Sequence, residues 1–209
     1  MIKHIVFDVD RTLVDSFESE LVSLKEALET VLNMKMSDEE MSKLTTLTTA
    51  DFFKNLGLNE EEIKLVNKEW DKTFQNTKTL CFPGIKNLVK TLYDEGYTIN
   101  ILTSRTMEEY HELDDELSDI SPMFNEIVTS DIVALPKPNN ASMVYLCDRL
   151  NSSSNEVIYI GDSISDKEFS INSNCFFIPA CWESKVLINE ENACTNPADI
   201  LEKVKKCRW

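Results

Sequence analysis

Two pairs of aspartates stand at spacings that suit catalysis. Asp8 and Asp10 follow the apolar run IVF. Residues i and i+2 of an extended segment point to the same side, so Asp8 and Asp10 present two carboxylates to one space. Such a pair can supply a nucleophile or a metal ligand beside a general acid. The alternative interpretation is an Asp-rich turn that follows a strand.

The second pair lies in the segment GDSISD at 161–166, directly after the run VIYI. Asp162 stands at the end of that run, and Asp166 follows four residues later, around the first turn of the helix expected there. Groups rich in carboxylate oxygens suit Mg²⁺, which also takes water and substrate phosphate. Asp166 or a neighbouring serine can also cap the helix, and capping is compatible with a catalytic role.

Two further segments carry polar groups that suit phosphate. Thr103, Ser104 and Arg105 close an apolar run, where hydroxyl and backbone N–H groups can hold phosphoryl oxygens. Arg105 is a candidate substrate contact, with an exposed ion pair as the alternative. Lys137 stands between two prolines, which restrict its backbone and can aim its ammonium at a fixed point. A surface lysine and helix-capping hydroxyls are the corresponding alternatives.

The elements that position these groups alternate along the chain. Short β-branched and aromatic runs alternate with helical segments, of which 85–95 and 141–150 have recognisable ends. This alternation predicts an α/β fold with a doubly wound, Rossmann-like parallel sheet. The carboxyl ends of parallel strands share one edge, where such folds place their sites. The expected strands end at Asp8 or cover 97–103, 126–129, 157–161 and 175–179.

One stretch breaks the alternation. Residues 16–79 contain no convincing strand. We therefore predict an all-helical unit at 16–79, inserted into an α/β core of residues 1–15 and 80–209. Its expected helices cover 17–34, 37–43, 49–55 and 59–76.

Composition excludes several classes of protein. The 209 residues contain 4 glycines, without a phosphate-binding glycine-rich loop or a G-x-G-x-x-G motif. The two histidines do not accompany a G-x-S-x-G motif. A net charge of −16 argues against nucleic-acid and anionic-membrane partners. Any site for an anion then needs a local cation or metal.

The cysteines and the first residues bear on location. Six cysteines occur without a C-x-x-C pair, which predicts reduced thiols. The opening run MIKHIVF is too short for a secretory signal or a membrane span. We therefore expect a cytoplasmic protein with no membrane partner.

In order along the chain, these motifs resemble the four motifs of the haloacid dehalogenase (HAD) superfamily. The matching segments are DVDRT at 8–12, ILTS at 101–104, Lys137-Pro138 and GDSISD at 161–166. The resemblance covers nearly the whole chain, and the insertion at 16–79 looks like that superfamily's helical cap. The segment CFPG at 81–84 resembles the return into the core in phosphoglycolate-phosphatase-like members.

The resemblance implies a Mg²⁺-dependent phosphatase for a small phosphorylated metabolite. Asp8 would form an aspartyl-phosphate, and Asp10 would protonate the leaving oxygen and then deprotonate water. Thr103 and Lys137 would hold the phosphoryl group. The metal would be held by Asp8, the backbone carbonyl of Asp10, Asp162 and Asp166. We expect a monomer or a weak dimer.

Departures and alternatives accompany this resemblance. Asp10 argues against dehalogenases, P-type ATPases and phosphonatases, and Thr12 favours a phosphatase over a mutase of the β-phosphoglucomutase type. That mutase stays open, as does a non-catalytic phosphate-binding or signalling module. Arg11 stands where many relatives have glycine, and Asn140 where a second proline often follows the Lys-Pro pair. Arg11 is a candidate contact to substrate or cap, with a solvated side chain as the alternative.

Overall fold

The chain divides into two compact units in a computed structural model. The structure describes residues 1–41, 43, 49–74 and 79–207. One unit comprises Met1–Asp15 with Leu80–Trp209, and the other is Ser16–Thr79. The chemistry-bearing residues named above all lie in the first unit, which we call the core unit.

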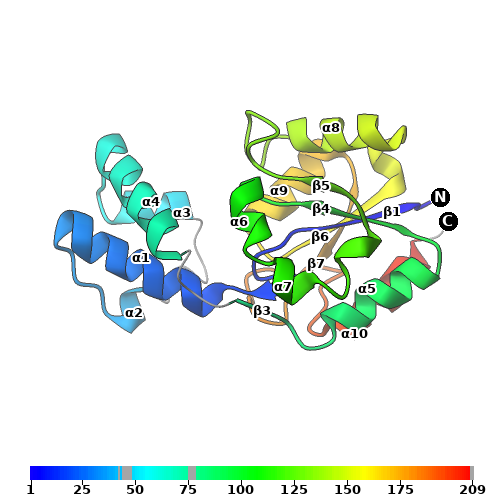
Figure 1. Ribbon diagram of the computed structural model, residues 1–209, viewed down its shortest axis with the longest axis horizontal. Coiled ribbons are helices and arrows are strands. Elements are labelled where there is room, and N and C mark those ends of the chain that lie inside the picture. The colour runs from blue at the N-terminus through cyan, green and yellow to red at the C-terminus, as the bar shows by residue number, and fades with distance from the viewer. Residues whose placement is uncertain (42, 44–48, 75–78, 208–209) are drawn as a thin grey trace. The chain divides into compact units, whose positions relative to one another are not determined.

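The core unit is built on a five-stranded parallel sheet (Figure 1), as the sequence predicts. Its strand order is β5-β4-β1-β6-β7, so the first strand of the chain lies at the centre. A strand at the centre of a parallel sheet is buried on both faces, which explains its short, uninterrupted apolar run. The strands are β1 (His4–Phe7), β4 (Thr98–Leu102), β5 (Phe124–Val128), β6 (Val157–Gly161) and β7 (Phe176–Pro179).

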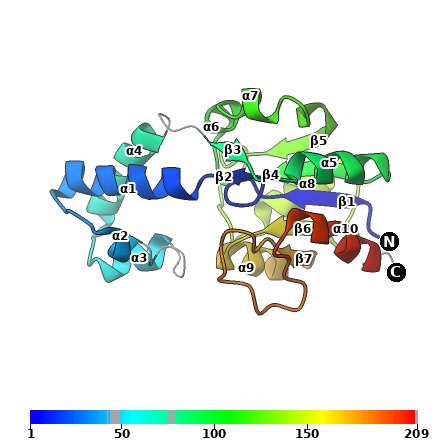
Figure 2. The ribbon, with the colours of Figure 1, turned by 90° about the horizontal axis from the view of Figure 1, so that it is seen from below.

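Two pairs of helices cover the two faces of this sheet. Helices α5 (Ile85–Asp94) and α10 (Pro197–Lys206) pack on one face against Ile5 and Phe7. Helices α8 (Ala141–Leu150) and α9 (Ile164–Ser173) pack on the other face. Figures 1 and 2 show the two layers on opposite sides of the sheet. The alternation of side chains along β1 thus divides the core into two apolar clusters.

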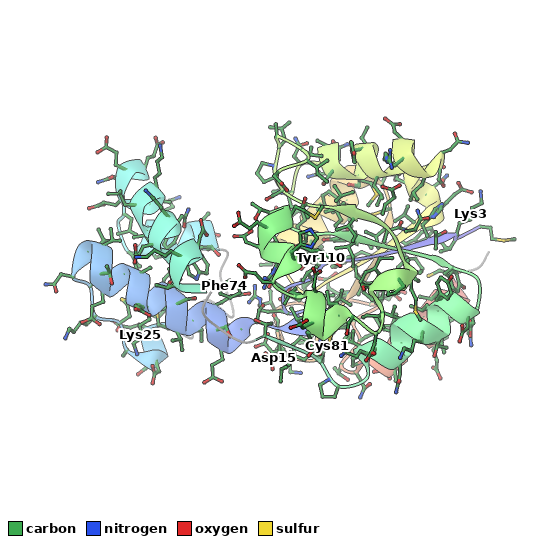
Figure 3. The ribbon with its side chains drawn as sticks, in the orientation of Figure 1. Lys3, Asp15, Lys25, Phe74, Cys81 and Tyr110 are labelled. Atoms are coloured by element: carbon green, nitrogen blue, oxygen red, sulfur yellow. The ribbon has the colours of Figure 1, made fainter. Side chains whose placement is uncertain are left out.

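Two short strands beside the insertion were not predicted from the sequence. Strand β2 (Val14–Asp15) pairs antiparallel with β3 (Leu80–Cys81), where the chain leaves the core unit and returns to it. Asp15 and Cys81 mark these strands in Figure 3. Two-residue strands carry no hydrophobic period, so only their pairing reveals them. Between β4 and β5 lie the short helices α6 (Met107–His111) and α7 (Asp114–Leu117).

The second unit is helical in its described residues. Its helices are α1 (Phe17–Leu32), α2 (Asp38–Met41), α3 (Thr49–Asn55) and α4 (Glu60–Phe74). Both aromatic residues of α3, Phe52 and Phe53, are buried in this unit's own core. Residue 42 of the expected helix 37–43 and residues 75–76 of the expected helix 59–76 lie outside the described residues.

Two further observations concern the cysteines and the length of the apolar helices. All six cysteines are free thiols. Within the described ranges, no helix combines the length and the apolar character that crossing a bilayer requires.

Gly161, at the end of β6, leaves the space that Asp166 occupies. A Cβ atom at position 161 would lie 2.6 Å from Cγ of Asp166, which is closer than carbon atoms can pack. We expect Gly161→Ala to lower the free energy of unfolding by about 2 kcal/mol, because either β6 or α9 must shift. Urea unfolding measures this loss.

The control is Ile171→Ala on α9, the helix that carries Asp166. The Ile171 side chain is 66% exposed, so its removal should cost little. We expect the control to change the free energy of unfolding by less than about 0.5 kcal/mol. Equal unfolding midpoints for Gly161→Ala and the parent would contradict the prediction.

Candidate active site

Asp8 stands at the carboxyl end of the central strand, where the neighbouring strands also end. Its backbone N–H donates to the carbonyl of Ile160 in β6 at 2.9 Å, and its side chain is buried. The residues that follow β4 and β6 are Thr103 and Asp162, so their chain positions reach the same edge. The sheet thus assembles the candidate site at its carboxyl edge.

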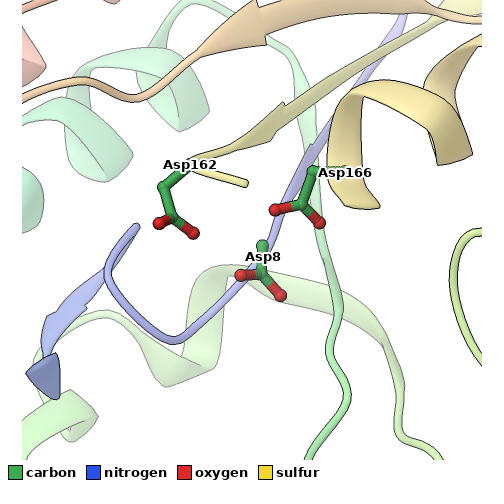
Figure 4. Close-up of side chains that lie close together, drawn as sticks. All are labelled: Asp8, Asp162 and Asp166. Atoms are coloured by element: carbon green, nitrogen blue, oxygen red, sulfur yellow. The ribbon is translucent and has the colours of Figure 1, made fainter. Parts of the chain in front are cut away.

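Three buried carboxylates face one another at this edge (Figure 4). Each of Asp8, Asp162 and Asp166 offers an oxygen, and these oxygens all lie within 4.8 Å of one another. Asp166 also caps α9, because its Oδ2 accepts from the backbone N–H of Ser163 at 3.1 Å and from its hydroxyl at 2.6 Å. The cap leaves Oδ1 of Asp166 to accept from Lys137 and Tyr159, so capping does not remove Asp166 from the carboxylate cluster.

Lys137 joins two of these carboxylates. Its Nζ donates to Oδ1 of Asp8 and to Oδ1 of Asp166, both at 2.8 Å. The side chain is only 8% exposed, so the alternative of a surface lysine is wrong. The loop that carries Lys137 is tied to α9. Asn140 donates to the carbonyl of Asn172 at 3.2 Å, and Asn172 donates to that of Pro138 at 2.9 Å.

Tyr159 is a member of the site that the sequence analysis missed. Its hydroxyl accepts from Nζ of Lys137 at 3.0 Å and donates to Oδ1 of Asp166 at 2.8 Å. The ring is fully buried and packs edge-on against Phe169, with 5.0 Å between centroids. A tyrosine inside a strand buried on both faces needs a partner for its hydroxyl, and that signal could have found it.

Arg105 contacts Asp10. Its Nε lies 3.1 and 2.9 Å from the two carboxylate oxygens, and Nη2 lies 2.6 Å from Oδ1. The Arg105 side chain is 5% exposed, so the alternative of an exposed ion pair is wrong. Its backbone N–H donates to Oγ1 of Thr103 at 3.1 Å. Thr103 is buried and Ser104 is exposed.

Arg11 pairs with the third carboxylate. Its Nε lies 3.3 Å from Oδ2 of Asp162, and its side chain is 21% exposed. The backbone of Arg11 has a φ of 56°, in the left-handed region that favours glycine. Of the predictions for Arg11, the solvated side chain is therefore wrong, because the guanidinium borders the carboxylate cluster.

Burial and pairing shift the pKa values of these groups in different directions. Burial raises the pKa of Asp8 to about 7, although Lys137 opposes the shift. Burial also acts on Asp166, but Lys137 and the hydrogen bonds from Ser163 and Tyr159 outweigh it and hold the pKa low. Asp166 and Asp8 raise the pKa of Lys137 against the effect of its burial. The site therefore holds one carboxyl that titrates near neutrality beside a permanent ion pair.

The donor set fits a hard divalent cation. The three clustered side chains offer only carboxylate oxygens, which Mg²⁺ prefers. Their three potential negative charges face two contacting cations, Lys137 and Arg11. A metal ion would offset the remaining charge, and it would hold Asp8 in its ionised form.

Comparisons with known proteins show which proteins this chain is similar to. A family model described as haloacid dehalogenase-like hydrolase matches residues 5–180. Phosphoglycolate phosphatase of Haemophilus influenzae is 26% identical over 180 residues, which cover 78% of this chain and 79% of that protein. Glyceraldehyde 3-phosphate phosphatase of Methanocaldococcus jannaschii is 26% identical over 183 residues, with 80% and 79% covered.

A solved structure shares the fold. It is titled a "predicted phosphatase" from Clostridium acetobutylicum and superposes with a TM-score of 0.83 at 20% identity, covering 99% of each chain.

The raised pKa of Asp8 predicts a pH-dependent stability in the presence of a chelator. The folded-state pKa of about 7 exceeds the ordinary value of 3.8, so the folded protein binds this proton more tightly than the unfolded chain. That contribution is present at low pH and is lost as the pH rises through about 7. Relative to Asp8→Asn, the parent should lose roughly 2 kcal/mol of unfolding free energy between about pH 5 and pH 8.

Chemical denaturation of both proteins across this range measures the difference. The Asp8→Asn variant is the reference for the parent, because its amide does not titrate. Parallel stability curves for the two proteins would refute a raised pKa of Asp8.

Removal of the Tyr159 hydroxyl should destabilise the protein without disturbing its packing. Tyr159→Phe leaves buried Lys137 and Asp166 each short of one hydrogen bond, and we expect a loss of about 1–2 kcal/mol in unfolding free energy. Tyr110→Phe is the matched control, because the Tyr110 hydroxyl is buried and accepts or donates no hydrogen bond within the described residues. Denaturant unfolding of both variants compares them. Equal effects would show that the Tyr159 contacts contribute nothing.

Proposed function

Because the chain belongs to the haloacid dehalogenase-like hydrolase family, we propose that it is a Mg²⁺-dependent phosphatase acting on a small phosphorylated metabolite. The observation that carries the proposal is the buried Asp8, which Lys137 contacts at 2.8 Å beside two further carboxylates. The two similar phosphatases named above act on phosphoglycolate and on glyceraldehyde 3-phosphate. Both are small phosphate monoesters, which supports a substrate of that class.

Asp8 acts as the nucleophile in this proposal. An oxygen of its carboxylate attacks the phosphorus atom, and an aspartyl-phosphate forms as the bond to the leaving oxygen breaks. Water then attacks the phosphorus and releases phosphate. Lys137 orients Asp8 and offers positive charge to the phosphoryl oxygens, and Thr103 and Ser104 add hydrogen-bond donors.

Asp10 moves the protons of the two steps. It gives a proton to the leaving oxygen and later takes one from the attacking water. Arg105 holds both oxygens of Asp10, so its role here is to orient this carboxylate, in place of the direct substrate contact expected from the sequence. Orientation of an acid–base group contributes to rate because it fixes the direction of proton transfer.

Asp8, Asp162, Asp166 and the backbone carbonyl of Asp10 would hold Mg²⁺. The ion would supply positive charge to the transferring phosphoryl group, which a chain of net charge −16 must provide locally. Residues 1–15 and 80–209 form the core domain in this proposal, and residues 16–79 form its helical cap domain. The substrate is the proposed partner.

The proposed reaction predicts the effect of removing the nucleophile. Phosphate release from an aryl phosphate and from a panel of phosphorylated metabolites should require Mg²⁺ and fall at least about a thousandfold in Asp8→Asn. Asp148→Asn, an exposed aspartate of α8, is the control and should keep the parent rate. Turnover that survives Asp8→Asn would exclude Asp8 as nucleophile. An isomerised sugar phosphate in place of free phosphate would identify a mutase.

A further inference from the structure

Each carboxylate of the clustered triad contacts a cation. Lys137 contacts Asp8 and Asp166, and Arg11 contacts Asp162. The two cations differ in burial, because the Lys137 side chain is 8% exposed and that of Arg11 is 21% exposed. Arg11 is thus the cation that can leave its carboxylate for solvent at the smaller cost.

The backbone of Arg11 adopts a strained conformation. The turn after β1 folds around the carbonyl of Val9, which accepts from the backbone N–H groups of Thr12 at 3.3 Å and Leu13 at 2.8 Å. This turn gives Arg11 its φ of 56°, a conformation that glycine adopts without strain and arginine does not. An amino acid with a side chain at such a position indicates that the side chain itself contributes something.

We propose that Arg11 is a counter-ion of Asp162 that competes with Mg²⁺ for this carboxylate and so sets the metal affinity of the site. The inference rests on the proposed function, which assigns Asp162 to the metal. A guanidinium 3.3 Å from Oδ2 of Asp162 lies within a few ångströms of any cation bound to that carboxylate. The two positive groups repel each other, and the metal must also replace the existing ion pair.

The consequence is a metal site that is weaker than its carboxylates alone would make it. Half-saturation with Mg²⁺ then requires a higher free concentration of the ion, because binding must displace a tethered competitor. The displaced guanidinium stays tethered beside the carboxylate cluster.

Calorimetric titration of Mg²⁺ into the substrate-free protein tests this directly. Arg11→Gln removes the charge, and we expect it to bind Mg²⁺ about tenfold more tightly than the parent. Arg11→Lys keeps a positive charge and should stay within about twofold of the parent. Arg11→Gly gives a second neutral variant that relaxes the backbone, so a folding defect in one neutral variant does not decide the result.

Arg149→Gln is the matched control for net charge. Arg149 of α8 pairs with Glu126 of β5, is 57% exposed and contacts none of the proposed metal ligands. We expect its Mg²⁺ affinity to equal that of the parent.

The outcomes separate this inference from the proposed function. Tighter Mg²⁺ binding in both neutral variants, with parent affinity in Arg11→Lys and Arg149→Gln, supports the inference. Parent binding of Mg²⁺ with unchanged or weaker binding in the neutral variants overturns it and leaves the proposed function standing. Weaker affinity for inorganic phosphate alone, at saturating Mg²⁺, would also overturn it in favour of a substrate contact. Absence of Mg²⁺ binding to the parent would overturn both.

Discussion

The buried ammonium of Lys137 is the interaction on which the rest of the site depends. Two ionised carboxylates can be buried side by side only when a cation compensates them, and the Lys137 Nζ lies 2.8 Å from both Asp8 and Asp166. Its placement requires three elements at once. The central strand carries Asp8, the first turn of α9 carries Asp166, and a loop tied to α9 by Asn172 carries the lysine. The fold of the core unit therefore also brings together the opposite charges of its site.

Burial and charge pairing shift the pKa values of Asp8 and Asp166 in opposite directions, although their residue type is the same. A carboxyl paired with a shared lysine, such as Asp8, keeps a pKa near neutrality because burial dominates. A carboxyl that also caps a helix, Asp166, stays ionised. One fold thereby places a carboxyl that titrates near neutrality beside one that stays ionised. The pairs are Lys137 with Asp8 and Asp166, Arg105 with Asp10, and Arg11 with Asp162.

Local patterns predicted the elements that carry the chemistry. The runs ending at Asp8 and Gly161 are strands, and the helix at 141–150 has the expected bounds. Hydrophobic period and capping residues are local properties, so one sequence is enough to read them. The two-residue strands β2 and β3 escaped because they exist only through pairing with each other. Tyr159 escaped because an aromatic residue in a buried strand looks like core packing.

The sequence by itself determined the α/β sheet and the set of acidic, hydroxyl and lysine groups at one edge of it, whereas the central place of the first strand came from the structure. Tertiary structure alone decided which cation each acid meets. Arg105 lies 95 residues from Asp10, and Lys137 lies 129 residues from Asp8. Such pairs form where folding brings distant backbones within a few ångströms, and electrostatic energy depends on that distance and on burial. The residue types show which charged groups are present, and only their positions in space decide how strongly those groups interact.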